Sequence, residues 1–206
     1  LKLVMLVALP AGIGLILLAG PVLSTLFQHG DFTSNDTYMA SLSLMAYILG
    51  LPAFILIKVL APGFYSRQDT KTPVRIAIIA MVCNMALNIL FVVPMVMLQY
   101  EAPHVGLALA TSSSGYINAL LLYRGLRKAG VYKPVAGWGS MLGKMLVASA
   151  CMTAALLYLT PGLEIWTWLT VLERAFYLAS IIGIAAVTYF AMLWLSGIRP
   201  GRLKRT

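Results

Sequence analysis

Six stretches of this chain contain no charged residue, and their length constrains the fold more than any other feature. They hold 19 to 25 residues each and are Leu3–Phe27, Tyr38–Ile57, Ile76–Leu98, Val105–Tyr123, Met145–Leu163 and Ala175–Ile198. A helix of about 20 residues crosses the roughly 30 Å hydrocarbon core of a bilayer. Only 10% of the residues are charged, against about 25% in soluble domains. The sequence therefore predicts an all-α, polytopic integral membrane helix bundle of six transmembrane helices, and excludes a soluble enzyme or a secreted disulfide scaffold.

The charges fall unevenly on the two sides of the predicted membrane. If Lys2 is cytoplasmic, six spans place 14 of the 15 Lys and Arg residues on the cytoplasmic side, with net charges of +13 there and −4 opposite. Cytoplasmic loops of membrane proteins carry such an excess of Lys and Arg. We therefore expect both termini in the cytoplasm, and the net charge of +9 requires no nucleic-acid partner.

The first span carries Pro10 and Pro21 with several glycines, which predicts a helix that is bent or loosened twice. The chain begins at Leu1 and enters this span after two residues, without a charged leader or a cleavage site. We therefore expect the chain to be the C-terminal piece of a longer membrane protein, whose missing N-terminal half is its partner.

The last two spans are plainer. Ala175, Ala179 and Gly183 are spaced four residues apart and predict a face for close helix packing on the final helix. Trp166 and Trp168, in the preceding loop, are expected to anchor the chain at the membrane interface.

Polar side chains at or inside the spans are candidates for a transport cavity. Lys58 follows the second window, where it either snorkels to the interface or faces a water-filled cavity. Asn84 and Asn88 share one face of the third helix because they are four residues apart.

A stripe of small and polar residues marks the fourth span and consists of Gly106, Ala110, Ser114 and Asn118. Such a stripe is typical of close packing with interhelical hydrogen bonds, or of the wall of a polar cavity. The transport-cavity candidates are thus Lys58, Asn84, Asn88, Ser114 and Asn118.

The segment Lys58–Val74 is the most specific string in the chain. Pro62 and Gly63 predict the end of a helix, and Thr72 before Pro73 predicts the next start, with Thr72 as N-cap. The result is a rigid cytoplasmic hairpin or, alternatively, a charged cluster beside a gate. The motif residues are Pro62, Gly63, Tyr65, Arg67, Asp69, Lys71, Thr72 and Pro73.

The sequence contains no glycine-rich phosphate loop, no zinc-ligand motif and no paired cysteines. An enzyme acting on polyprenyl phosphates would gather carboxylates for Mg²⁺ at the cytoplasmic face, where Asp69 is the only predicted acid. The sequence therefore predicts no catalytic residue, cofactor or metal site.

Three strings carry a resemblance to a known family: Lys58–Val74, of which Ala61–Pro73 is the most specific part, the loop Phe27–Thr33 and the later Leu121–Arg127. Together they closely resemble the MurJ/MviN family of lipid II flippases, within the multidrug/oligosaccharidyl-lipid/polysaccharide exporter superfamily, and the resemblance extends over essentially the whole chain. It implies a bacterial inner-membrane protein of fourteen helices, of which this chain forms helices nine to fourteen. Residues 1–126 would be the last four helices of the C-terminal lobe, 127–144 a basic cytoplasmic linker, and 145–206 a terminal helix pair with a basic tail.

The resemblance also implies a function. The whole protein would move undecaprenyl-diphosphate-linked peptidoglycan precursor from the inner to the outer leaflet by alternating access, for cell wall synthesis. Its headgroup-binding arginines would lie in the missing part, and the last two helices would hold the polyprenyl tail. The alternatives are a flippase for another lipid-linked glycan, a drug or cation antiporter of the same superfamily, and, from another class, a membrane-bound glycan-lipid enzyme or a scaffold.

Overall fold

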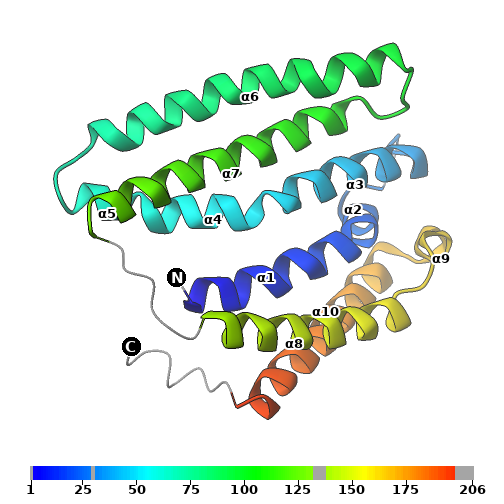
Figure 1. The fold of residues 1–206 in the computed structure, drawn as a ribbon. Helices are drawn as coiled ribbons and strands as arrows, with labels where there is room; N and C mark the ends of the chain where they lie inside the picture. The colour runs from blue at the N-terminus through cyan, green and yellow to red at the C-terminus, as the bar shows by residue number, and fades with distance from the viewer. Residues whose placement is uncertain (1, 29–30, 132–137, 198–206) are drawn as a thin grey trace. The chain divides into compact units, whose positions relative to one another are not determined.

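The computed structural model describes residues 2–28, 31–131 and 138–197, and all regular elements over these residues are α-helices. In chain order they are α1 (Lys2–Leu17), α2 (Ala19–Phe27), α3 (Ser34–Leu49), α4 (Leu51–Leu60), α5 (Pro62–Tyr65), α6 (Lys71–Met97), α7 (His104–Lys128), α8 (Trp138–Leu159), α9 (Leu163–Trp168) and α10 (Val171–Leu195) (Figure 1).

Five helical stretches of the described chain are long and apolar enough to cross a membrane. They are the continuous run Ser34–Tyr65 together with α6, α7, α8 and α10. The bent pair α1–α2 makes a sixth if it counts as one broken span. The prediction of an all-helical membrane protein is therefore confirmed, with five or six candidate spans. The count of exactly six and the side of the membrane on which each loop lies stay predictions.

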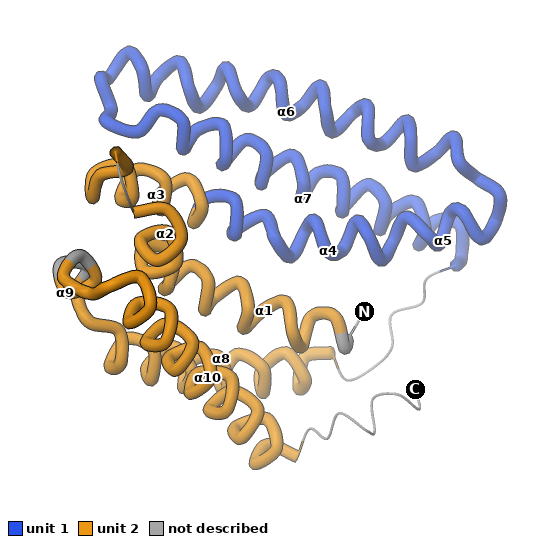
Figure 2. Tube along the Cα trace, turned by 180° about the vertical axis from the view of Figure 1, so that it is seen from behind, with its two compact units in different colours: residues 1, 46–136 blue, residues 2–45, 137–206 orange. Residues whose placement is uncertain are grey.

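The chain divides into two compact units, coloured separately in Figure 2. One unit comprises residues 46–136 and the other comprises residues 2–45 with 137–206. The unit 46–136 contains α4 to α7 and the last turn of α3, and α7 packs against both α6 and α4. Glycines permit these contacts: a Cβ on Gly106 of α7 would lie 3.1 Å from Val92 of α6, and one on Gly115 would lie 2.7 Å from Phe54 of α4.

The bend in the first span is a property of Pro21. Pro21 has no N–H for the carbonyl of Leu17, and its ring crowds that carbonyl, so the helix breaks at Leu18. The angle between the two halves is 69°. Pro10 lies inside α1 without ending it. Of the two predicted irregularities, the one at Pro21 is a sharp bend, and the helix continues through Pro10.

The second unit is held together by an apolar core that α1, α2, α8 and α10 share. Its buried members include Leu6, Leu18, Met145, Met152, Leu156, Ile181, Ala185, Tyr189 and Leu193. The predicted packing face of the last helix is wrong, because Ala175, Ala179 and Gly183 are exposed. Large side chains at Ile181, Tyr189 and Leu193 face the core instead, together with Ala185, because large side chains make more of the van der Waals contacts that hold helices together in lipid.

Trp166 also contradicts its prediction. Its side chain is completely buried and meets the ring of Tyr177 edge-on, with centroids 5.6 Å apart. It is therefore a core residue rather than an interfacial anchor. Trp168, two residues later, is 88% exposed, and its anchoring role stays a prediction.

The contacts group the helices differently from the predicted domains. The sequence separated the first four spans from the terminal pair, but α1 and α2 pack with α8 and α10. The predicted linker 127–144 is shortened at both ends, because α7 continues to Lys128 and α8 begins at Trp138. Residues 132–137 of that linker and the tail from residue 198 lie outside the described residues, and the assignment to a transporter lobe stays a prediction.

Candidate functional site

Three of the predicted cavity residues meet where α6 packs on α7. The amide nitrogen of Asn84 donates to the hydroxyls of Ser114, at 3.1 Å, and Thr111, at 3.4 Å. The amide of Asn88 in turn donates to Oδ1 of Asn84 at 3.0 Å. These bonds favour the interpretation of the stripe as a helix-packing face, with interhelical hydrogen bonds that replace bonds to water.

Asn88 keeps one unused polar atom in this seam of hydrogen bonds. Its Oδ1 is buried and accepts no hydrogen bond from the described residues. A buried amide oxygen without a donor is costly, so this is the part of the seam best suited to meet water or a polar group. Asn118, one turn further along α7, is partly buried, and Lys58 on α4 is exposed.

The opposite side of α7 contacts the end of α3 through residues that the sequence did not single out as functional. The hydroxyl of Ser112 donates to the carbonyl of Ala46 at 2.6 Å, and that of Tyr116 donates to the carbonyl of Leu49 at 2.8 Å. Both carbonyls lie just before Gly50, where α3 ends and α4 follows. The only sequence signal for this contact is Gly50 itself, followed by Pro52.

The hairpin motif folds differently from the prediction. Helix α4 ends at Leu60, and Pro62 and Gly63 begin the short helix α5 instead of ending a helix. Pro62 fits there because the first turn of a helix needs no N–H from it. The turn falls later, at Gln68, whose φ of 59° reverses the chain.

Thr72 is not the N-cap of the next helix. Helix α6 begins at Lys71, and the Asp69 carboxylate accepts the Thr72 backbone N–H at 3.0 Å. This hydrogen bond, together with the nearby Arg67 guanidinium, holds the pKa of Asp69 below its ordinary value of 3.8. Asp69 thus starts the helix, a role for which its acceptor oxygens suit it.

The hairpin is attached to α7 by apolar contacts. Phe64 packs with Leu122 and Leu126 in a small buried cluster, and a Cβ on Gly125 would lie 2.9 Å from the Phe64 ring. Tyr65, Arg67 and Lys71 are exposed, whereas Pro73 is buried. The structure thus holds the hairpin rigidly on α7 and leaves its basic side chains accessible.

The second unit has an apolar cavity of about 420 Å³. Residues of α1, α2, α8 and α10 line it, among them Pro10, Gly14, Leu18, Leu156, Ala185, Tyr189 and Phe190. The cavity lies beside residues 145–163 and 175–198, where the polyprenyl tail is expected, and α1 and α2 form its other walls. Its use as a tail groove stays a prediction.

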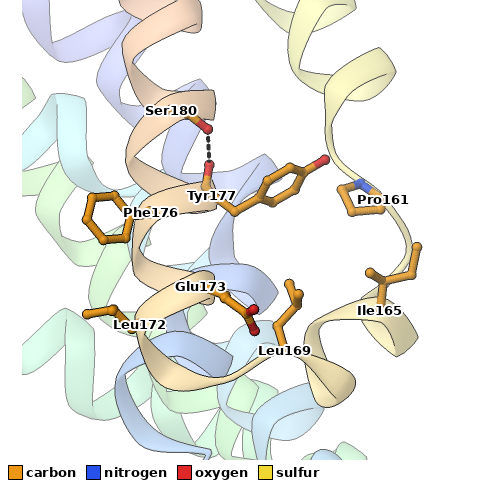
Figure 3. Close-up of a pocket in the computed structure, with 8 residues that line it drawn as sticks. All are labelled: Pro161, Ile165, Leu169, Leu172, Glu173, Phe176, Tyr177 and Ser180. Atoms are coloured by element: carbon orange, nitrogen blue, oxygen red, sulfur yellow. Dashed lines mark hydrogen bonds between the residues drawn. The ribbon is translucent and has the colours of Figure 1, made fainter.

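A second, open groove of about 580 Å³ lies between the start of α10 and the loop before it (Figure 3). Figure 3 shows Tyr177 extending from α10 toward Pro161. Glu173 is the acidic residue that lines this groove. Its carboxylate accepts hydrogen bonds from the backbone N–H and the hydroxyl of Thr170 and completes the capping box of α10. This carboxylate is therefore engaged in starting a helix.

The start of α10 also holds a buried arginine, Arg174, which no motif of the sequence marks. Arg174 is 7% exposed, and its Nη1 donates to the carbonyls of Ser24, at 3.0 Å, and Gln28, at 3.3 Å. Its Nε donates to the carbonyl of Leu169. Arg174 thus brings a positive charge and additional donors to the carbonyls of Ser24 and Gln28 at the C-terminal end of α2.

Across the part of the chain that the structure describes, no three His, Cys, Asp or Glu side chains gather as metal ligands would. What the geometry defines is a polytopic, helical membrane protein with polar residues between helices and an apolar cavity in its second unit.

Comparison with known proteins places the chain within this class. Residues 1–179 match the model of the family described as "Lipid II flippase MurJ". A Vibrio cholerae protein named "Probable lipid II flippase MurJ" is 45% identical over 99% of this chain and 38% of its own length, and a Haemophilus influenzae protein of the same name is 44% identical over 98% and 38%. A Burkholderia cenocepacia protein named "Lipid II flippase MurJ" is 36% identical over all of this chain and 39% of its own length.

The chain belongs to the MurJ family of lipid II flippases. It spans less than two fifths of the length of these relatives.

Proposed function

We propose that this chain forms the C-terminal part of a lipid II flippase of the bacterial inner membrane. In this proposal it acts with a preceding N-terminal half and carries lipid II from the inner to the outer leaflet for peptidoglycan synthesis. The observation that carries the proposal is the 45% identity with the Vibrio cholerae flippase over 99% of the chain. The membrane-spanning helices support it, since a transporter of lipids works inside the bilayer.

The physical problem that such a protein solves is the polar headgroup. A diphosphate joined to sugars and a peptide cannot cross hydrocarbon unaided, so it needs a polar path between helices while its tail stays in an apolar environment. This requires transport, without chemical change of the lipid. We therefore assign the chain no catalytic role and no cofactor.

We assign the two parts of the substrate to different units of this chain. The apolar cavity lined by Pro10, Leu156 and Phe190 suits a polyprenyl tail, because its lining is apolar along α1, α8 and α10. The seam around Asn84 and Asn88 contributes to the polar path, and the buried Oδ1 of Asn88, which has no donor among the described residues, is the acceptor that a donor on the path would use. Ser114, Asn118 and Lys58 remain the other candidates on this path, and the hairpin around Arg67 is proposed to lie at its cytoplasmic end.

A chimera tests the function directly. This chain replaces the matching residues of the Vibrio cholerae relative in cells depleted of their own flippase, and the outer-leaflet accessibility of lipid II is measured together with growth. A chimera carrying the Haemophilus influenzae segment, which is 44% identical to this chain, is the matched control. We expect both chimeras to restore growth and accessibility.

Other outcomes identify the alternatives. If only the control restores accessibility, this chain does not serve lipid II, and another lipid-linked glycan or a drug becomes the better substrate. If lipid II is not made at all after depletion, the protein acts in an enzymatic step upstream.

The polar path is tested in the same chimera by adding a negative charge. We expect Asn88→Asp to abolish complementation, because a carboxylate in the seam faces either packed helix or the path of a diphosphate. Glu101→Gln, which removes a charge from an exposed loop residue, is the control and should complement. Normal growth of the Asn88→Asp chimera would remove Asn88 from the path.

A further inference from the structure

The junction of α3 and α4 departs from regular helix at Gly50. The Gly50 N–H bonds to the carbonyl of Tyr47, three residues back, at 3.0 Å. A regular α-helix would pair it with Ala46, four residues back. Two residues later, Pro52 has no N–H to offer the carbonyl of Ile48. The backbone therefore leaves the carbonyls of Ala46 and Ile48 without their usual helical donors.

Helix α7 supplies donors to this junction from outside the span. Ser112, which is 4% exposed, donates its hydroxyl to Ala46 at 2.6 Å and lies 3.4 Å from the carbonyl oxygen of Tyr47. Tyr116, one turn further along α7, donates to Leu49 at 2.8 Å. Two side chains of α7 thus bind the backbone of α3 at Ala46 and at Leu49. These two carbonyls lie on either side of the Ile48 carbonyl, which Pro52 leaves without its usual donor.

The two helices are too close at this point for a larger residue. A Cβ on Gly50 would lie 2.6 Å from Oγ and 2.8 Å from Cα of Ser112. The second of these is a backbone atom, which a change of rotamer cannot move away. The close approach of α7 to the junction therefore requires a glycine at position 50.

We propose that the Gly50 junction is a hinge of the transport cycle, and that Ser112 and Tyr116 are the positioning residues that set its angle. The inference rests on the proposed function, because alternating access requires helices that change direction. In the observed state Ser112 holds the carbonyl of Ala46. In the alternative state the Gly50 N–H takes that carbonyl, so that the regular four-residue hydrogen bond forms at Gly50. The Ser112 hydroxyl then turns to a carbonyl of its own helix, as serines in helices do.

Hydrogen exchange in the chimera described above tests the hinge. The protein is placed in lipid nanodiscs, and exchange of residues 46–54 is followed by mass spectrometry with and without purified lipid II. We expect lipid II to change the exchange of this segment. We expect Ser112→Ala to speed it roughly fivefold, the effect of losing one hydrogen bond, and to remove the response to lipid II.

Two further variants make the outcome decisive. Tyr116→Phe keeps the ring and removes the hydroxyl, and should speed exchange in the same segment. Ser113→Ala removes a hydroxyl from the neighbouring position of α7 and should behave as the unsubstituted protein.

Two results would overturn the hinge. One is an exchange rate at residues 46–54 that does not respond to lipid II although the same preparation translocates it. The other is equal behaviour of Ser112→Ala and Ser113→Ala. If the unsubstituted preparation neither binds nor translocates lipid II, the proposed function itself fails.

Discussion

The hydroxyl of Tyr189 on α10 donates a 2.8 Å hydrogen bond to the carbonyl oxygen of Leu6 on α1. Leu6 lies four residues before Pro10, and its carbonyl has no helical donor because Pro10 lacks an N–H. Tyr189 is 1% exposed, so water does not replace this bond. A proline in one helix is thus compensated by a tyrosine that lies 183 residues away from the carbonyl along the chain.

This relationship predicts a specific coupling. We expect Tyr189→Phe to lower the free energy of unfolding by about 1–2 kcal/mol, because the buried Leu6 carbonyl loses its donor. With Pro10→Ala in the background the loss should nearly vanish, since the substituted alanine donates its own backbone N–H to the Leu6 carbonyl. A double-mutant cycle by chemical denaturation of the chimera in bicelles measures this coupling. An equal cost of Tyr189→Phe in both backgrounds would contradict the compensation.

Arg174 should also contribute to the stability of the unit that contains Tyr189. We expect Arg174→Gln to lower the free energy of unfolding by about 2–3 kcal/mol, because charged donors to the Ser24 and Gln28 carbonyls are lost. The measurement is the same denaturation, with exposed Arg75→Gln as the control. A cost no larger than that of the control would show that these bonds contribute little.

Two glycines in helical spans should respond to alanine in opposite directions. Gly50→Ala should destabilise the protein by about 1–3 kcal/mol, because its Cβ would lie 2.8 Å from Cα of Ser112. Gly183→Ala should stabilise it by about 0.5–1 kcal/mol, because a Cβ there has no neighbour within 4 Å and alanine favours helix. Thermal unfolding of both variants checks the pair. Stabilisation by Gly50→Ala would refute the close contact at Gly50, and destabilisation by Gly183→Ala would refute the open space at Gly183.

Acid should weaken the hairpin through Asp69. The Thr72 N–H lowers the pKa of Asp69 from its ordinary value of 3.8. A lowered folded-state pKa stabilises the folded state fully above the unfolded value, and this stabilisation is lost as the pH falls through the folded value. We expect the amide hydrogens of residues 66–72 to exchange faster below about pH 4. The substitution Asp69→Asn should remove that pH dependence. Its persistence in Asp69→Asn would assign it to another group.

The orientation of the chain is a prediction from charge and can be tested by labelling. Single cysteines replace Tyr100 and Lys128, both exposed and at opposite ends of the α6–α7 pair, in the chimera without other cysteines. A membrane-impermeant maleimide should label the Tyr100→Cys protein in intact spheroplasts. It should reach the Lys128→Cys protein only after permeabilisation. The reverse pattern would invert the proposed topology.

The sequence determined the helical membrane architecture because that information is local along the chain. Charge-free windows of about 20 residues specify spans without knowledge of their neighbours, and Pro21 bends its own helix wherever that helix packs. The pairing of Asn84 with Ser114 was also within reach, since the polar stripes of two consecutive helices face each other. The family resemblance followed from strings such as Ala61–Pro73, which are likewise local.

Tertiary structure decided which side chains complete the backbone. Ser112 on Ala46, Tyr189 on Leu6 and Arg174 on Ser24 each join segments at least 66 residues apart, and no local pattern pairs them. The same reason explains why the predictions for Trp166 and for the face Ala175–Gly183 were wrong. Every face of an apolar helix is hydrophobic, so the sequence does not show which face is buried. The shape of the neighbouring helices decides it. In a membrane span the sequence sets where the helix lies, and packing sets which carbonyls and rings it must satisfy.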